Sequence, residues 1–207
     1  MQFDPNTLSI KDTHKLMISV IAPRPIAWVV SQNAKGQLNA APFSFFNIVS
    51  DDPPLIGISV GGAERGVPDY KDTARNIQEH GEFVVNIVTR DMMEQMVRTG
   101  VDYHQSVNEL EVAGLATLPS VTVKPPRIAG CPASLECTRF QVLDFASHRQ
   151  FIIGRINMIH VKDEAVLDAA KCYIDTPKLD AVGRMHGAGW YTEMKSWFQL
   201  RTPPRPD

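Results

Sequence analysis

Short apolar runs separated by turn-forming residues dominate the first half of the chain. Their β-branched and aromatic residues predict strands at Ile26–Ser31, Leu38–Pro42, Phe45–Val49 and Leu55–Val60. Asparagine, glycine and proline residues at 33–36 and 53–54 mark turns between these strands, and a loop is expected over 61–68. The first half of the chain is therefore expected to form a series of adjacent strands.

The pattern becomes helical after residue 70. Helices are expected over Thr73–His80 and Asp91–Arg98, with a strand between them at Phe83–Val88. Asp72 or Thr73 would cap the first helix, and Gly81 would end it.

The second half contains two long strands, Ala133–Asp144 and Gln150–Lys162, which are expected to form a hairpin with its turn at 146–148. Residues 99–126 are expected to be mostly irregular. A glycine-rich loop, Gly183–Gly189, precedes a strand expected from Trp190 to Leu200. Because strands outnumber helices and do not alternate with them, we expect a mainly β fold with a few short helices (β or α+β). The architecture would be an antiparallel, closed or nearly closed barrel, formed by one domain over residues 1–207.

The composition of the chain argues against several classes of protein. The 207 residues include 21 basic and 23 acidic side chains, so the net charge is -2, and binding to nucleic acid or to an anionic membrane is not expected. The N-terminus lacks a signal-peptide pattern, and no run of 18 apolar residues occurs. Three cysteines without a CxxC pair favour a reduced, cytoplasmic protein.

The common catalytic motifs do not occur. The sequence has no GxxxxGK[ST], no GxGxxG after a strand, no HExxH and no GxSxG. Its six histidines lack the spacing of metal ligands, so we expect no metal site.

One unusual segment is Arg24–Asn47, where small residues alternate with aromatic ones and Pro42 interrupts any regular strand ladder. A proline here indicates a sheet edge or a bulge, where backbone N–H groups point away from the sheet. Such groups beside small side chains suit a flat heterocycle with several acceptors, such as a flavin ring. The alternative is a kinked core strand that binds nothing.

The second unusual segment is Tyr70–Asn76, in which Lys71 precedes a helix with Thr73 in its first turn. Free N–H groups, the helix dipole, a hydroxyl and an ammonium group together suit a monophosphate. Asp72 would oppose an anion, so we expect it to turn away and cap the helix. Many helices that begin with Asp-Thr bind no ligand, and that alternative stays open.

Together these segments resemble the flavin-reductase-like, FMN-binding split-barrel family. The likeness covers most of the chain and is carried by RPIAWVVS (24–31), LNAAPFSFFNIVSDDPP (38–54), KDTARNI (71–77), GEFVVNIV (81–88) and GRMHGAGWY (183–191). The resemblance implies a homodimeric split β-barrel with FMN at the subunit interface. The residues it implies for cofactor binding are Trp28, Val30, Ser31, Asn39, Ala40, Ala41, Ser44, Phe45, Phe46, Asn47, Lys71 and Thr73.

The glycine-rich loop near the C-terminus offers further candidates. His186 is a candidate catalytic residue, and Arg184 is another group that could approach the cofactor or the substrate. Trp190 or Tyr191 could cover the ring, although these aromatics could instead pack an interface. His104 is a candidate for a lid near the flavin, or else a solvated loop residue.

The family resemblance implies an oxidoreductase that reduces flavin or a small acceptor with NADH or NADPH. The flavin carries the electrons, so no side-chain acid, base or nucleophile is required. An oxygenase or an electron-transfer protein is a possible partner. The alternatives are an FMN-bearing electron carrier without nicotinamide binding, and a flavin-free barrel that acts as a binding or assembly module.

Overall fold

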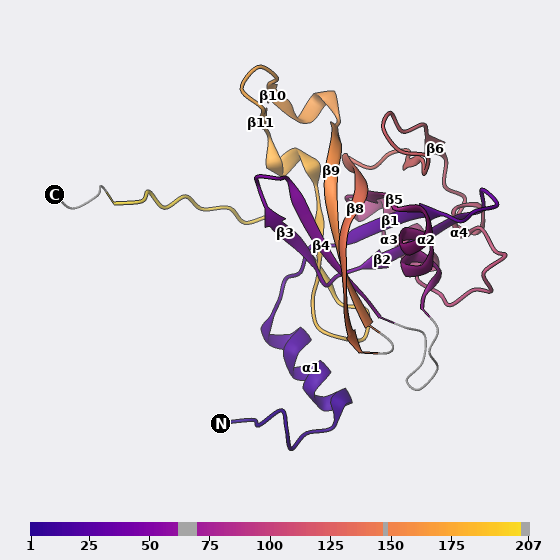
Figure 1. The fold of residues 1–207 in the computed structure, drawn as a ribbon. Coiled ribbons are helices and arrows are strands. Elements are labelled where there is room, and N and C mark those ends of the chain that lie inside the picture. Colours follow the sequence, from indigo (N-terminus) through magenta and orange to yellow (C-terminus); the bar gives the residue numbers. More distant parts are fainter. Residues whose placement is uncertain (62–69, 147–148, 204–207) are drawn as a thin grey trace.

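A curled antiparallel sheet forms the centre of the computed structural model, which describes residues 1–61, 70–146 and 149–203 (Figure 1). Within these residues seven strands pair in the order β2-β1-β5-β8-β9-β4-β3. Their bounds are β1 Ala27–Gln32, β2 Leu38–Phe43, β3 Phe46–Ser50, β4 Leu55–Gly61, β5 Glu82–Asn86, β8 Ala133–Ala146 and β9 Arg149–Val161. Smaller antiparallel pairs join β6 (Thr117–Leu118) with β7 (Arg127–Ile128), β10 (Val166–Asp168) with β11 (Tyr173–Ile174), and β12 (Val182–Arg184) with β13 (Tyr191–Glu193).

The two edges of the sheet meet at the corner between β2 and β3. These strands are the outermost in the pairing order, yet only Ser44 and Phe45 separate them in the chain. The N–H of Ser59 in β4 donates to the carbonyl of Phe45 over 2.8 Å. The sheet therefore curls into a barrel, and the expected mainly β, antiparallel fold with few helices is confirmed.

Strand β1 is buried on both faces. Its successive side chains point to opposite sides of the sheet, and other elements cover each side. Ala27 and Val29 pack inside the barrel with β4, β5 and helix α2 (Asp72–His80). Trp28 and Val30 pack on the other face against α3 (Met93–Arg98) and α4 (Glu109–Val112). The continuous apolar run of this strand reflects these two cores.

Helix α2 lies close to the expected position. Its Ala74 and Ile77 are buried in the barrel core, and Gly81 ends it with a φ of 73°, which favours glycine. The expected cap was wrong. Lys71 occupies the N-cap position, and no described side chain caps the N–H groups of this helix.

Several other expectations also need correction. A helix absent from the sequence prediction, α1 (Ile10–Val20), begins where the Ser9 hydroxyl accepts from the N–H of Asp12. The helix expected over Asp91–Arg98 divides into the 3-10 turn η1 (Arg90–Met92) and α3. Residues 99–126 are mostly irregular, as expected, and contain only the short elements α4 and β6.

The prediction of a strand from Trp190 to Leu200 is wrong beyond the first few residues. Only Tyr191–Glu193 pairs, with β12, and residues 194–203 form no strand because no neighbouring strand lies along them in the described structure. This C-terminal segment and α1 extend away from the barrel (Figure 1). Short 3-10 turns η2 (Asp163–Ala165) and η3 (Thr176–Leu179) complete the fold. The expected loop over 62–68 and the turn residues 147 and 148 lie outside the described residues.

Candidate functional site

A cavity of about 540 Å³ lies between β2, the start of α2 and the segment after α3. The two segments singled out in the sequence line it together. Strand β2 contributes Asn39, Ala41, Pro42 and Phe43, and the helix start contributes Tyr70, Lys71, Asp72, Thr73 and Arg75. The third wall is made by Thr99, Gly100, Val101, Asp102, Tyr103, His104, Gln105 and Glu109. The volume is within the range of small-molecule sites.

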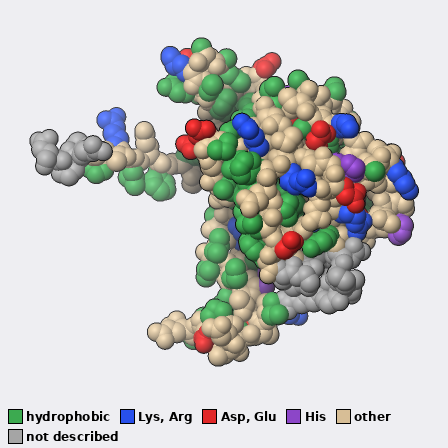
Figure 2. All heavy atoms as spheres, in the orientation of Figure 1, with side chains coloured by type: hydrophobic (Ala, Val, Ile, Leu, Met, Phe, Trp, Pro, Cys, Tyr) green, Lys and Arg blue, Asp and Glu red, His purple; other side chains and the backbone are tan. Residues whose placement is uncertain are grey.

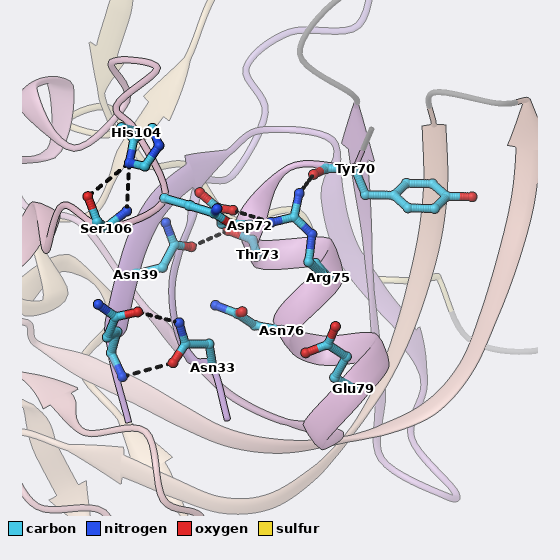
Figure 3. A network of polar contacts seen from close by, with 12 residues as sticks. Asn33, Asn39, Tyr70, Asp72, Thr73, Arg75, Asn76, Glu79, His104 and Ser106 are labelled. Atoms are coloured by element: carbon cyan, nitrogen blue, oxygen red, sulfur yellow. Dashed lines mark hydrogen bonds and ion pairs between the residues drawn. The ribbon is translucent and has the colours of Figure 1, made fainter. Parts of the chain in front are cut away.

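Two cations line this cavity, and each is paired with a carboxylate. Lys71 Nζ lies 2.9 Å from Asp102 Oδ1, and the two side chains are 33% and 68% exposed. Arg75 Nη1 lies 2.8 Å from Asp72 Oδ1. The expectation that Asp72 turns away to cap the helix was therefore wrong, because its carboxylate lines the cavity and binds Arg75 (Figure 3).

Thr73 and Asn39 join the helix to the strand at the base of the cavity. The Thr73 hydroxyl donates to Asn39 Oδ1 over 2.7 Å (Figure 3), and the Ser31 hydroxyl donates to the same oxygen over 3.3 Å. Asn76 Nδ2 donates in turn to Ser31 Oγ over 3.1 Å. These four side chains are buried, so their mutual hydrogen bonds satisfy groups that water does not reach.

Glu109 is a buried carboxylate in the same cavity and is only 5% exposed. Asn39 Nδ2 donates to its Oε1 and the N–H of Ala40 donates to its Oε2, both over 3.0 Å. Burial raises the pKa of Glu109, and these hydrogen bonds oppose that rise. No local pattern in the sequence marks Glu109 as a site residue.

A second cavity, of about 500 Å³, continues from the first. The two cavities adjoin at the end of β2, where Pro42, Phe43 and Gly100 line both, and we refer to the pair as the groove. The second cavity is also lined by Ser44 and by residues of the C-terminal loop, Arg184, Gly189 and Tyr191. The Arg184 guanidinium lies 4.5 Å from the centre of the Tyr191 ring.

Comparison with known proteins identifies the fold that carries this groove. Residues 19–177 match the model of the flavin reductase like domain. The chain belongs to this family. The family resemblance drawn from the sequence is thereby confirmed.

Solved structures agree with the family assignment. The 2-nitrobenzoate 2-nitroreductase NbaA of Pseudomonas fluorescens superposes with a TM-score of 0.89 and 32% identity, covering 98% of this chain and 96% of that one. Nitrilotriacetate monooxygenase component B from Bacillus cereus gives 0.89 and 31%, with 97% and 98% coverage. A protein of Halalkalibacterium halodurans, BH2278, is 40% identical over an alignment of 208 positions, gaps included, which covers 98% of this chain and 97% of the relative.

In this flavin reductase-like chain the structure divides the expected cofactor residues into groups. Asn39, Ala41, Lys71 and Thr73 line the first cavity, and Ser44 lines the second.

A second group of expected residues is buried in the core. Trp28, Val30 and Ala40 lie in the apolar cluster beneath α3 and α4, and Trp28 Nε1 donates to Thr99 Oγ1 over 2.9 Å. These side chains, with that of Ser31, support the walls of the groove and do not line it.

A third group, Phe45, Phe46 and Asn47, lies past the corner after Phe43. The Phe45 ring lies 5.6 Å from the Arg149 guanidinium and 6.0 Å from that of Arg24. Phe46 packs at the edge of the barrel core, and the Asn47 side chain accepts from the N–H of Ile48. None of the three expected residues lines either cavity.

The two candidate histidines differ in position. His104 lines the first cavity, and its Nδ1 lies 2.9 Å from Ser106 Oγ. His186 is exposed, and its ring stacks on Trp190 with the centroids 5.6 Å apart. It lines neither cavity of the described chain.

The described residues contain no group of three or more His, Cys, Asp and Glu side chains arranged to hold a metal ion. None of their helices is long and apolar enough to cross a membrane.

Proposed function

We propose that this protein is an FMN-dependent oxidoreductase, in which residues 1–207 form one flavin-binding domain. FMN would lie along the groove with its phosphate beside Lys71 and its ring toward Ser44 and Arg184. The observation that carries the proposal is that the lysine-led start of α2 faces the Asn39–Phe43 stretch of β2 across a cavity that continues to Arg184.

The residues at the α2 end fit a phosphate monoester. The first N–H groups of α2 have no cap from a described side chain, and the positive end of the helix dipole points the same way. Lys71 adds a cation whose partner Asp102 is mostly exposed, so a bound phosphate could replace that carboxylate at little cost. Arg75 adds a second cation, a guanidinium, beside the same turn.

The β2 end of the groove suits a flat ring. Small and planar side chains would contact the ring there, and the backbone N–H groups of this strand would not. Ala40 gives its N–H to Glu109, and Pro42, two residues along, has none. Ring acceptors would therefore be met beyond β2, at Ser44 and Arg184. Ala41 and Phe43 would pack against the ring and exclude water from it.

A bound FMN would supply the redox chemistry, the transfer of two electrons from NADH or NADPH to a second flavin or a small acceptor. The chain would contribute position and electrostatics. Lys71 and the α2 N–H groups would hold the phosphate, and Thr73 would be oriented by Asn39.

A homodimer is part of this proposal. Two segments that extend from the barrel expose large apolar side chains at Ile10, Met17, Val20, Ile21, Met194, Trp197, Phe198 and Leu200. Hydrophobic side chains also gather at the β10–β11 end (Figure 2). Exposed apolar surface of this extent is typical of an interface. Light scattering should therefore give twice the mass of one chain.

The relatives suggest what could take the electrons. One similar structure is that of a 2-nitrobenzoate 2-nitroreductase, and another is that of a nitrilotriacetate monooxygenase component. We therefore propose a nitroaromatic compound, or flavin delivered to an oxygenase, as acceptor.

The test uses purified protein under anaerobic conditions. FMN should bind and quench its fluorescence, and NADH or NADPH should bleach the bound flavin. Steady-state oxidation should then follow when free FMN or 2-nitrobenzoate is added. A protein that binds no flavin would overturn the proposal, and one that binds FMN without reacting with either nicotinamide would be an electron carrier instead.

A further inference from the structure

The second cavity of the groove carries an unbalanced positive charge. Arg184 is the one charged side chain among the described residues that line it, so no carboxylate stands opposite. The rest of the lining is mainly apolar, from Ile26, Pro42, Phe43, Val97 and Tyr191. The first cavity differs, because Asp72, Asp102 and Glu109 stand beside its two cations.

Arg184 is available to a ligand. None of the ion pairs between described residues includes it. Its guanidinium lies 4.5 Å from the centre of the Tyr191 ring, a contact that orients the cation without neutralising it. A guanidinium carries five N–H donors, so Arg184 can contact the edge of a flavin ring and still offer two donors to a second molecule.

Arg24 adds a second cation behind the same wall. It is only 7% exposed, and its guanidinium donates to three backbone carbonyls, those of Ile18, Ile21 and Met185. Its Nε lies 3.5 Å from the hydroxyl of Ser44, which lines the cavity. Burial lowers the pKa of Arg24, and the nearby charge of Arg184 lowers it further. Two neighbouring cations that pair with no carboxylate of the described chain favour a bound anion.

We propose that the second cavity binds an electron acceptor that carries a carboxylate on an aromatic or apolar body, with the carboxylate on Arg184. This inference rests on the proposed FMN-dependent function and names the class of acceptor. The planar fork of a guanidinium matches a carboxylate through two parallel hydrogen bonds, and the apolar side chains around it suit an uncharged body. The cavity of about 500 Å³ is by itself within the range of small-molecule sites, so the groove has room for a small molecule beside FMN.

The electron donor gives no reason for a cation in this cavity. The nicotinamide ring of NADH or NADPH is uncharged, and it becomes positive once it has given up hydride. Arg184 would therefore repel the oxidised ring. The negative charges of the donor lie on its phosphates, and their contact with Arg184 would change the KM for the donor.

A positively charged approach adjoins the second cavity. A third cavity, of about 640 Å³, meets it where Gly189 and Tyr191 line both. Arg90 and Lys195 line this third cavity, and both pair with Glu193. Two cations and one carboxylate leave a net positive charge there, which favours the approach of an anion.

The first test measures binding to oxidised, FMN-loaded protein. Benzoate and benzamide are similar in size and differ in charge, and each is titrated while the flavin absorbance is followed. We expect benzoate to bind roughly tenfold more tightly than benzamide, or better. Arg184→Gln should remove that preference, and Arg184→Lys, which keeps the charge but not the fork, should retain part of it.

The second test compares the kcat/KM values of 4-nitrobenzoate and 4-nitrobenzamide as acceptors. Loss of Arg184 could also change the flavin, but such a change affects both acceptors alike, so the ratio of the two values isolates carboxylate recognition. We expect Arg184→Gln to lower this ratio roughly tenfold or more. Arg127→Gln is the matched control and should leave the ratio unchanged, because Arg127 donates to the Pro119 carbonyl and lines none of the three cavities.

Equal affinity for benzoate and benzamide in the unsubstituted protein would overturn this proposal. An equal loss of kcat/KM for both acceptors in Arg184→Gln would also overturn it, because Arg184 would then act on the flavin alone. An effect confined to the KM for NADH or NADPH would overturn it in favour of the donor phosphates. Failure of the protein to bind FMN would instead overturn the proposed function itself.

Discussion

Thr73 donates its hydroxyl hydrogen to the side-chain oxygen of Asn39 over 2.7 Å, which joins the first turn of α2 to strand β2. The two residues are 34 positions apart in the sequence, so they come into contact only when the chain folds. It sets the distance between the two walls of the groove, and so we expect it to matter both for stability and for ligand binding.

Thr73→Val should lower the free energy of unfolding by about 0.5–1.5 kcal/mol, because it removes one buried hydrogen bond and keeps the side-chain shape. It should also weaken FMN binding. Urea denaturation and flavin titration measure the two effects. Thr73→Ser keeps the hydroxyl and should restore both, whereas equal behaviour of the two variants would show that the hydroxyl has no role.

Lys71→Ala should weaken FMN binding by roughly 1.5–3 kcal/mol, about 10- to 150-fold, through loss of one charge-assisted contact. The affinity for riboflavin, which lacks the phosphate, should not change. Lys15→Ala is the matched control, since Lys15 also pairs with a surface aspartate, Asp12. Unchanged FMN affinity in Lys71→Ala would mean that the phosphate binds elsewhere.

Asp102→Asn should have the opposite effect. The variant frees Lys71 from its ion pair, so FMN should bind more tightly by about 0.2–1 kcal/mol, the typical worth of an exposed pair. The gain should vanish in the double variant with Lys71→Ala. Additive effects of the two substitutions would contradict competition between Asp102 and the phosphate.

Glu136 should make the stability of the fold depend on pH in the acidic range. The Glu136 side chain is fully buried, and burial alone would raise its pKa. Hydrogen bonds outweigh this effect and lower the pKa from 4.5 to about 2. They come from the Thr122 hydroxyl, the Val121 and Thr122 N–H groups and His160. A depressed carboxyl pKa stabilises the fold above pH 4.5, and that stability is lost as pH falls toward 2.

Glu136→Gln should therefore cost about 1.5–3 kcal/mol of unfolding free energy at neutral pH. The difference from the unsubstituted protein should shrink as pH falls from about 4.5 to 2, as measured by urea denaturation across that range. Glu164→Gln, an exposed acid, should show no such dependence. A pH-independent difference for Glu136→Gln would contradict the assignment.

The local pattern was enough to predict the features that depend on near neighbours in the chain. The β-branched run of β4 and the helix of α2 with its stop at Gly81 were located within one or two residues. The motif order between Arg24 and Val88 was enough to indicate the family. Strand propensity and helix termination act over a few residues, so the sequence shows them directly.

Only the tertiary structure decided which side chains line the groove. Glu109 reaches Asn39 from 70 residues away, and Asp102 meets Lys71 although no short-range pattern links them. The corner after Phe43 places Ser44 in the groove, while Phe45 and Asn47 line neither cavity, although all three belong to one motif. The order of residues determined the strands and the family, but the curl of the sheet determined the site, because burial and charge pairing depend on contacts between distant segments.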